Sequence, residues 1–131
     1  MASITFTNNT WTLCMDTSDL YALSPLDGRY HGKLSALRTI TSEYGLIYYR
    51  SLVEVRWLQH LSGLSELPAC PTLPTTGQTL LEQFLHQFDT TDACAIKNIE
   101  QTTQHDVKAI EYHLQDFLKK HPSLTLYQPW V

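Results

Sequence analysis

Two short polar segments hold the residues of this 131-residue chain that are best suited to binding a charged ligand. The first is Gly28-Arg29-Tyr30, where flanking Ser-Pro and Asp-Gly dipeptides predict a loop. The second is Thr102-Thr103-Gln104-His105-Asp106, at a predicted helix start. We expect Thr103 to cap that helix, whose first-turn N–H groups favour a nearby anion. An arginine on a loop and a histidine beside such N–H groups suit a phosphate or a carboxylate.

Both segments also have a purely structural interpretation. Thr-x-x-Asp is a common helix cap, and Asp106 in a first turn complements the helix dipole. Arg29 can be a solvated loop residue, and Tyr30 a core aromatic whose hydroxyl reaches water. Spacing alone leaves both interpretations open.

Helical segments are predicted to position these residues. We expect helix caps at Ser42 and within the stretch from Asp89 to Asp92, and a capping box at Thr79-x-x-Glu82. Pro122 is expected to end the last helix. Apolar residues recur at helical spacing between these signals. The predicted helices are 33–39, Ser42–Leu61, Thr79–Phe88, Ala93–Glu100 and Asp106–Lys120, with a proline-rich irregular connection over 65–77.

The long helix carries two neighbouring rows of side chains. The first is Leu46, Tyr49, Val53 and Trp57, and the second is Ile47, Glu54, Leu58 and Leu61. Such a wide apolar stripe predicts burial on more than one side. If the packing partners are missing from this chain, Tyr49, Trp57 or their neighbours are expected to be partly uncovered and to favour self-association.

The N-terminal stretch is the only segment with strand character. Threonine-rich alternation on both sides of Asn8-Asn9 predicts a small hairpin over Ser3–Leu13, although a frayed tail fits these residues equally well. We find no strand–helix alternation and no internal repeat. The sequence therefore predicts an all-α fold with one core, a possible exception being this hairpin.

Composition excludes several classes of protein. Nine Lys and Arg against 13 Asp and Glu, a net charge of −4, offer no basic surface for nucleic acid. No apolar run is long enough to span a membrane. Cys14, Cys70 and Cys94 lack CxxC spacing, which favours a reducing compartment, the cytoplasm. The six histidines show no metal-ligand spacing, so we expect no metal site.

Four stretches resemble the N-terminal region of bacterial adenylosuccinate lyase. They read ALSPLDGRY (22–30), SEYGL (42–46), EVRWL (54–58) and IKNIEQTTQHDVKAIEY (96–112). The stretches follow the family's order and extend from about Tyr21 to the last helix. The first twenty residues and the proline-rich connection match less well.

The resemblance implies the helical N-terminal domain of the fumarase/aspartase superfamily, whose members are mostly homotetramers. These lyases cleave adenylosuccinate to AMP and fumarate, and SAICAR to AICAR and fumarate, in purine biosynthesis. The reaction is a β-elimination, in which a base removes a proton and an acid protonates the departing nitrogen. The resemblance implies no metal and no organic cofactor. We expect residues 1–20 to be an extension and 21–131 to be the helical domain.

By motif, the resemblance assigns substrate binding to five residues. Arg29 and Tyr30 match a pair that contacts the nucleotide, His105 would hydrogen-bond the substrate, and Asp106 would fix the local geometry. Gln104 stands where relatives often carry Asn or Arg, so its contact is expected to differ. The family's catalytic histidine and its serine loop have no counterpart in the sequence, and His113 and His121 are poor substitutes. We therefore assign no catalytic residue and expect the 131 residues alone to be inactive.

Two alternatives stay open. The chain could be a non-catalytic helical module that binds a purine nucleotide or a lyase subunit, with Arg29 and His105 serving binding alone. A small all-α enzyme in its own right is less favoured, because Arg50 and Arg56 fall within the long helix and are expected on solvated faces.

Overall fold

The computed structural model describes residues 4–7, 10–13 and 20–131. They form two compact units, Met1–Ile40 and Thr41–Val131. In the first unit, β1 (Ile4–Thr7) pairs antiparallel with β2 (Thr10–Leu13), in a register that sets Thr7 opposite Thr10. This pairing confirms the predicted hairpin strands, while Asn8-Asn9 lie outside the described residues. The boundary expected at residue 20 stays a prediction.

The rest of the first unit is a loop followed by short helical turns. A 3₁₀ turn, η1 (His31–Lys33), leads into α2 (Ser35–Thr41), which corresponds to the short helix predicted over 33–39. The second unit begins at the C-terminal end of α2.

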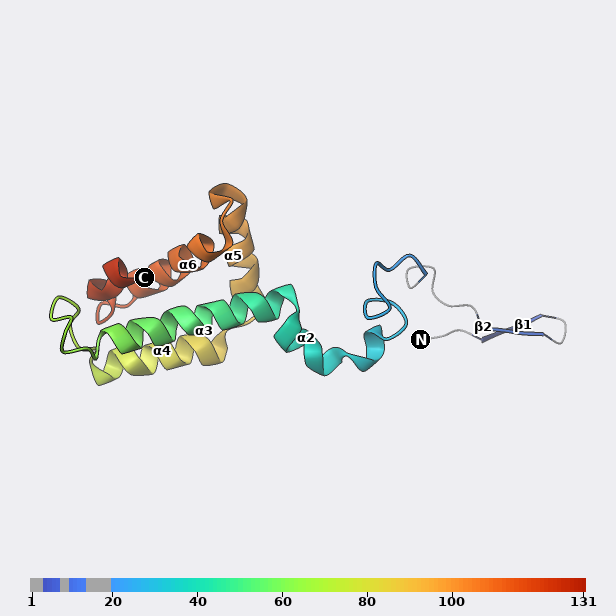
Figure 1. The fold of residues 1–131 in the computed structure, drawn as a ribbon, viewed down its shortest axis with the longest axis horizontal. Coiled ribbons are helices and arrows are strands. Elements are labelled where there is room, and N and C mark those ends of the chain that lie inside the picture. Colours follow the sequence, from blue (N-terminus) through green and yellow to red (C-terminus); the bar gives the residue numbers. More distant parts are fainter. Residues whose placement is uncertain (1–3, 8–9, 14–19) are drawn as a thin grey trace. The chain divides into compact units, whose positions relative to one another are not determined.

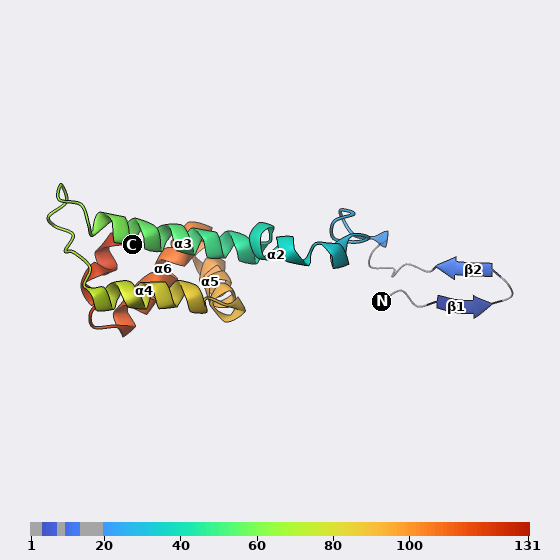
Figure 2. The ribbon, with the colours of Figure 1, turned by 90° about the horizontal axis from the view of Figure 1, so that it is seen from below.

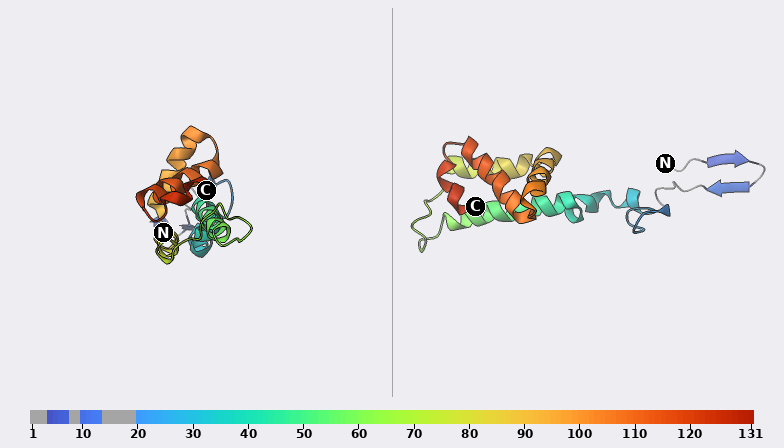
Figure 3. Two further views of the ribbon diagram at one scale, coloured as in Figure 1. Left: turned by 90° about the vertical axis from the view of Figure 1, so that its left-hand side faces the viewer. Right: turned by 90° about the horizontal axis from the view of Figure 1, so that it is seen from above.

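The second unit is a helical bundle, as the sequence predicts. It contains α3 (Glu43–Leu61), α4 (Thr75–Gln87), α5 (Thr90–Thr103), α6 (Asp106–Lys120) and the 3₁₀ helix η2 (Thr125–Trp130). α4 and α6 both pack along α3, and α5 runs across them (Figure 1). α3 and α4 lie alongside each other (Figure 2), and an end-on view shows α3, α4 and α6 around a common centre (Figure 3). No helix in the described residues is long and apolar enough to cross a membrane.

Local signals set the start of α3 as predicted, and α6 ends before Pro122 as predicted. The Ser42 hydroxyl accepts from Gly45 N at 3.3 Å and caps α3. At the start of α5, Asp89 and Asp92 form a capping box, although the helix is longer than the predicted 93–100 at both ends. These caps satisfy N–H groups that would otherwise lack partners.

The predicted start of α4 is wrong. The helix begins at Thr75 after Pro74, not at Thr79, and Thr79 Oγ1 donates to Thr75 O at 3.0 Å from inside the helix. Glu82 is not part of a capping box but pairs with Arg56. Pro74 has its φ near the helical value, and Gly77 is packed under Leu124, which holds this earlier turn in place.

Of the two predicted rows of α3, the first is exposed. In the second, Ile47 and Leu58 are buried, whereas Glu54 and Leu61 are only partly buried. Ile47, Ser51, Val55 and Leu58 are buried, whereas Leu46, Tyr49, Val53 and Trp57 are exposed. In the described structure the wide stripe is therefore buried on one side only, contrary to the prediction. The expectation that Tyr49 and Trp57 are partly uncovered is confirmed.

The core extends to the end of the described chain, which the sequence did not predict. Tyr127 in η2 is buried, and its hydroxyl donates to Thr72 O at 2.9 Å, in the connection between α3 and α4. The buried apolar cluster comprises Ile47, Val55, Leu58, Leu73, Leu81, Phe84, Leu85, Phe88, Ala93, Ile96, Ala109, Ile110, Leu114, Leu118, Leu124 and Tyr127.

Candidate functional site

Gln104 forms the corner between α5 and α6. Its backbone is left-handed, with φ 52°, and its N–H donates to Glu100 O at 2.8 Å. The side-chain amide turns back on α5, where Nε2 donates to Gln101 O at 2.7 Å. Gln104 therefore shapes the turn that presents the next two residues, and its amide nitrogen is engaged within that turn.

His105 is the N-cap of α6. Its Nδ1 accepts a hydrogen bond from Lys108 N at 3.2 Å, so the neutral ring carries its proton on Nε2. Most of the side chain is exposed, and Nε2–H is available as a donor. The predicted cap, Thr103, is instead the last residue of α5, and its hydroxyl donates to His105 O at 3.1 Å.

Asp106 is held from two sides. Its Oδ1 accepts from Val107 N at 2.8 Å, and its Oδ2 pairs with Arg50 Nη1 on α3. The Arg50 hydrogen bond, aided by the Val107 N–H, holds the pKa of this carboxyl below its usual range. Asp106 is therefore ionised at neutral pH and lies 3.8 Å from His105 Nδ1.

These contacts correct the expectation of an open anion site at the start of α6. Two first-turn N–H groups, of Val107 and Lys108, already bond to the side chains of Asp106 and His105. The helix start therefore presents an imidazole donor beside a fixed carboxylate.

Arg29 and Tyr30 lie in the first unit, on the predicted turn. Gly28 N donates to Ser24 O at 3.1 Å and Tyr30 N to Pro25 O at 2.9 Å, and these bonds close the loop. Gly28 is buried, whereas the Arg29 and Tyr30 side chains are exposed. Both are thus accessible to a ligand. The structure brings Gln104, His105 and Asp106 together in the second unit, and Arg29 and Tyr30 together in the first.

Curated proteins similar to this chain share one name. The adenylosuccinate lyases of Vibrio cholerae, Haemophilus influenzae and Escherichia coli K12 are each 46% identical to it over 110 residues. The matches cover 84% of this chain and 24% of each relative, and they fall in the N-terminal part of the lyase. The chain is therefore similar to the N-terminal part of these adenylosuccinate lyases. It spans about a quarter of the length of these relatives. No family model matches the chain.

The candidate site contains a residue that the sequence did not reveal. Arg50 was expected on a solvated face, yet it bonds the carboxylate of Asp106. The position of Arg50 beside an apolar row indicated only that it lies on the surface of a helix. Its contact with Asp106 could not be predicted, because the two residues are 56 positions apart and no short-range pattern pairs them.

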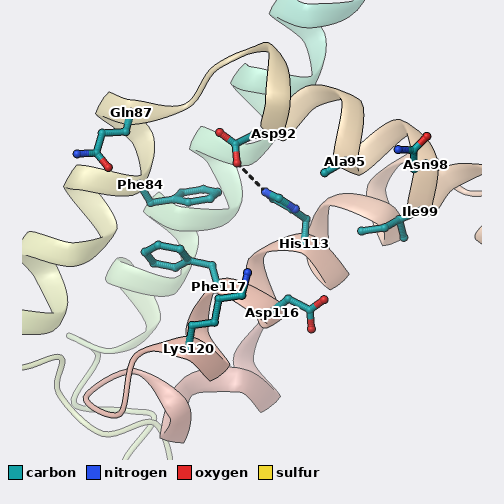
Figure 4. Close-up of a pocket in the computed structure, with 10 residues that line it drawn as sticks. All are labelled: Phe84, Gln87, Asp92, Ala95, Asn98, Ile99, His113, Asp116, Phe117 and Lys120. Atoms are coloured by element: carbon teal, nitrogen blue, oxygen red, sulfur yellow. Dashed lines mark hydrogen bonds and ion pairs between the residues drawn. The ribbon is translucent and has the colours of Figure 1, made fainter.

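A groove of about 580 Å³ lies between α4, α5 and α6 (Figure 4). His113 Nε2 lies 3.1 Å from Asp92 Oδ1, and Asp92 Oδ2 accepts from Asp89 N at 3.1 Å. The rings of Phe84 and Phe117 form one wall, with centroids 4.7 Å apart. No sequence-predicted site residue lines this groove. The histidine therefore links α6 to the capping box of α5, and no sequence signal indicated that contact.

A metal centre is not apparent in the part of the chain that the structure describes. No three His, Cys, Asp or Glu side chains gather there in a way that could hold an ion. The arrangement at His105, Asp106 and Arg50 can bind and orient a ligand through hydrogen bonds and charge.

Proposed function

We propose that this chain is the N-terminal part of an adenylosuccinate lyase and contributes one portion of its substrate site. The activity is the β-elimination of fumarate from adenylosuccinate and from SAICAR, in a cytoplasmic homotetramer that uses no cofactor. The observation that carries the proposal is the 46% identity to adenylosuccinate lyases over 84% of the chain. The exposed polar groups of the candidate site agree with a role in substrate binding.

Each proposed role follows from the chemistry of the side chain. The Arg29 guanidinium suits the phosphate of the nucleotide, and the Tyr30 phenol can donate a neighbouring hydrogen bond. His105 offers Nε2–H to a substrate oxygen because Nδ1 accepts from Lys108 N. Arg50 keeps Asp106 ionised. The carboxylate therefore places a fixed negative charge next to His105, where the substrate would bind.

The acid and the base of the elimination are proposed to come from elsewhere in the assembled lyase. The sequence of 131 residues lacks the histidine and serine motifs that the resemblance associates with these steps. We therefore expect the purified chain alone to release no fumarate from adenylosuccinate, as followed by ultraviolet absorbance. Clear turnover would contradict this division of roles.

A chimera tests the binding roles directly. This chain would replace the matching N-terminal quarter of the Escherichia coli lyase, and kcat/KM for adenylosuccinate would be measured. We expect an active chimera in which Arg29→Ala and His105→Ala each lower kcat/KM by about tenfold or more, the loss typical of a charge-assisted hydrogen bond. Lys33→Ala, which removes an exposed cation from the same unit, is the control and should have little effect.

The outcomes separate the hypotheses. A folded but inactive chimera would count against the proposed function. An active chimera that tolerates Arg29→Ala and His105→Ala would leave the lyase assignment standing and remove these residues from its site. Calorimetry of the isolated chain with AMP tests the alternative of a nucleotide-binding module.

A further inference from the structure

Arg50 reaches from α3 to the start of α6. Its Nη1 pairs with Asp106 Oδ2, and the two side chains are 34% and 48% exposed. Ile47 and Ser51, which flank Arg50 on α3, are buried, and so is Ile110 on α6. Because α6 also packs along α3, the core fixes the backbone at both ends of this ion pair. The guanidinium therefore has a defined position relative to the start of α6.

Two side chains at the start of α6 share the N–H groups of its first turn. Asp106 Oδ1 accepts from Val107 N at 2.8 Å, and His105 Nδ1 accepts from Lys108 N at 3.2 Å. Arg50 holds the other carboxylate oxygen, Oδ2. Both oxygens of Asp106 are thus engaged, and the Lys108 N–H is left to orient the His105 ring, whose Nε2–H is the donor offered to a ligand.

At neutral pH the ion pair matters for the direction of the carboxylate more than for its charge. The hydrogen bond from Arg50 is the main reason that the pKa of Asp106 lies below its usual range, but an ordinary aspartate is already ionised at neutral pH. A half-exposed side chain that loses one of its two partners can turn about its Cα–Cβ bond to another staggered rotamer. Since Oδ1 lies 3.8 Å from His105 Nδ1, such a turn frees the carboxylate to compete for the N–H that orients the ring.

We propose that Arg50 is a positioning residue of the candidate site, which fixes the Asp106 carboxylate and thereby keeps the His105 ring oriented for the substrate. The inference rests on the proposed lyase function, and it assigns Arg50 no contact with the substrate. Ion pairs of this exposure contribute little to stability, so the consequence of losing this one is expected at the site. Misplacement of a substrate-contacting group by about 1 Å can lower a rate by up to about a hundredfold, so a small rotation is enough.

Arg56 offers a matched control on the same helix. Its Nη2 donates to Glu82 Oε2 at 2.9 Å, and these two side chains are 51% and 49% exposed. This ion pair joins α3 to α4, two helices whose residue ranges include none of the sequence-predicted site residues. Arg50→Ala and Arg56→Ala each remove one interhelical ion pair of an arginine. A purely structural effect would therefore be similar for both variants.

Kinetics of the chimera with the Escherichia coli lyase test the positioning role. Arg50→Ala lowers kcat/KM for adenylosuccinate by about tenfold, and Arg56→Ala stays within about twofold of the parent chimera. Arg50→Lys, which keeps the cation without the planar fork, recovers part of the loss. In a double-mutant cycle, Arg50→Ala lowers kcat/KM by less than about twofold once Asp106→Ala is in place, because it acts through that carboxylate. An Arg50→Ala chimera as active as the parent, or a full further loss in the Asp106→Ala background, overturns the proposal.

A measurement on the 131-residue chain separates this inference from the lyase assignment. Three-bond NMR couplings across the Cα–Cβ bond of Asp106 report whether its side chain keeps a single rotamer. The wild type and Arg56→Ala show the couplings of one rotamer, and Arg50→Ala shows averaged couplings. If the parent chimera is inactive, the proposed function fails, and these couplings alone decide whether Arg50 positions Asp106. Couplings that Arg50→Ala leaves unchanged overturn the proposal even if the chimera is active.

Discussion

The hydroxyl of Tyr127 offers a clean test of how the end of the chain is fixed to the bundle. The side chain is 3% exposed, and its Oη donates to Thr72 O at 2.9 Å. Tyr127→Phe removes this hydrogen bond and leaves the ring in place. The perturbation is therefore confined to one donor and the carbonyl that loses it.

The magnitude follows from the burial of the Tyr127 side chain, since Thr72 itself is exposed. A neutral hydrogen bond contributes about 1 kcal/mol to stability, and a carbonyl left short of a donor adds to the loss. We expect Tyr127→Phe to lower the free energy of unfolding by about 1–2 kcal/mol. For a unit of about 90 residues, such a loss lowers Tm by roughly 5–10 °C.

Urea and thermal unfolding of the full chain, followed by circular dichroism, measure this loss. Tyr112→Phe is the matched control, because Tyr112 is on α6 and is exposed. It should change the free energy of unfolding by less than about 0.5 kcal/mol. If the two variants were equally stable, the hydrogen bond to Thr72 would contribute nothing and the reasoning would fail.

The same residue predicts a pH dependence. Burial raises the pKa of the Tyr127 phenol above its usual value of 10.0. The folded chain therefore retains this proton more strongly than the unfolded chain, and stability is lost as the pH rises above 10. Tyr127→Phe lacks this loss, so its deficit relative to the wild type should shrink in alkaline solution.

Three further substitutions test other parts of the structure. Burial, together with repulsion from Glu111, raises the pKa of half-buried Glu54. The folded state therefore loses stability as the pH rises through that pKa and Glu54 becomes ionised. After allowance for solvent screening, Glu54→Gln should raise the free energy of unfolding near neutral pH by about 0.5 kcal/mol. In urea titrations below about pH 4, where Glu54 is protonated, the variant and the wild type should have the same free energy of unfolding. Leu114→Ala, at a site that is 1% exposed, should cost about 2–5 kcal/mol in the same assay. Gln104→Gly should raise thermal stability by up to about 1 kcal/mol, because glycine adopts a φ of 52° without strain, and a clear loss would contradict this.

Helix ends that depend on neighbouring residues were predictable from the sequence. Ser42 caps α3 and Pro122 follows α6, and both signals act within a few residues of the helix they bound. The start of α4 was not predictable in this way. Thr75 and Gly77 have the composition of a loop, and their helical turn is held by packing beneath Leu124, which is distant in sequence.

The orientation of α3 shows a second limit. Periodicity finds the exposed row and two members of the buried one, Ile47 and Leu58, but does not say which side faces the core, because the neighbouring helices decide that. The buried row contains Ser51, whose hydroxyl donates to Ile47 O at 2.9 Å and is thereby satisfied without water. The more apolar row, with Trp57, is the one left exposed.

The candidate site was predictable only in part. Segment composition indicated His105 and Asp106, and the structure brings them together at the start of α6. The N-cap of α6 was misassigned to Thr103. Thr103 and His105 both lie near the start of that helix, and only the conformation of the turn between α5 and α6 decides which of them caps it. The Arg50 contact depends on the packing of α3 against α6, which no local pattern encodes.

The cap at His105 gives this molecule an internal reporter. Nδ1 can accept from Lys108 N only while that nitrogen carries no proton. A ligand that rotates the ring removes the acceptor and exposes the Lys108 amide to solvent. Hydrogen exchange at this single amide therefore reports whether the ring still holds its place at the helix start, without any need for turnover.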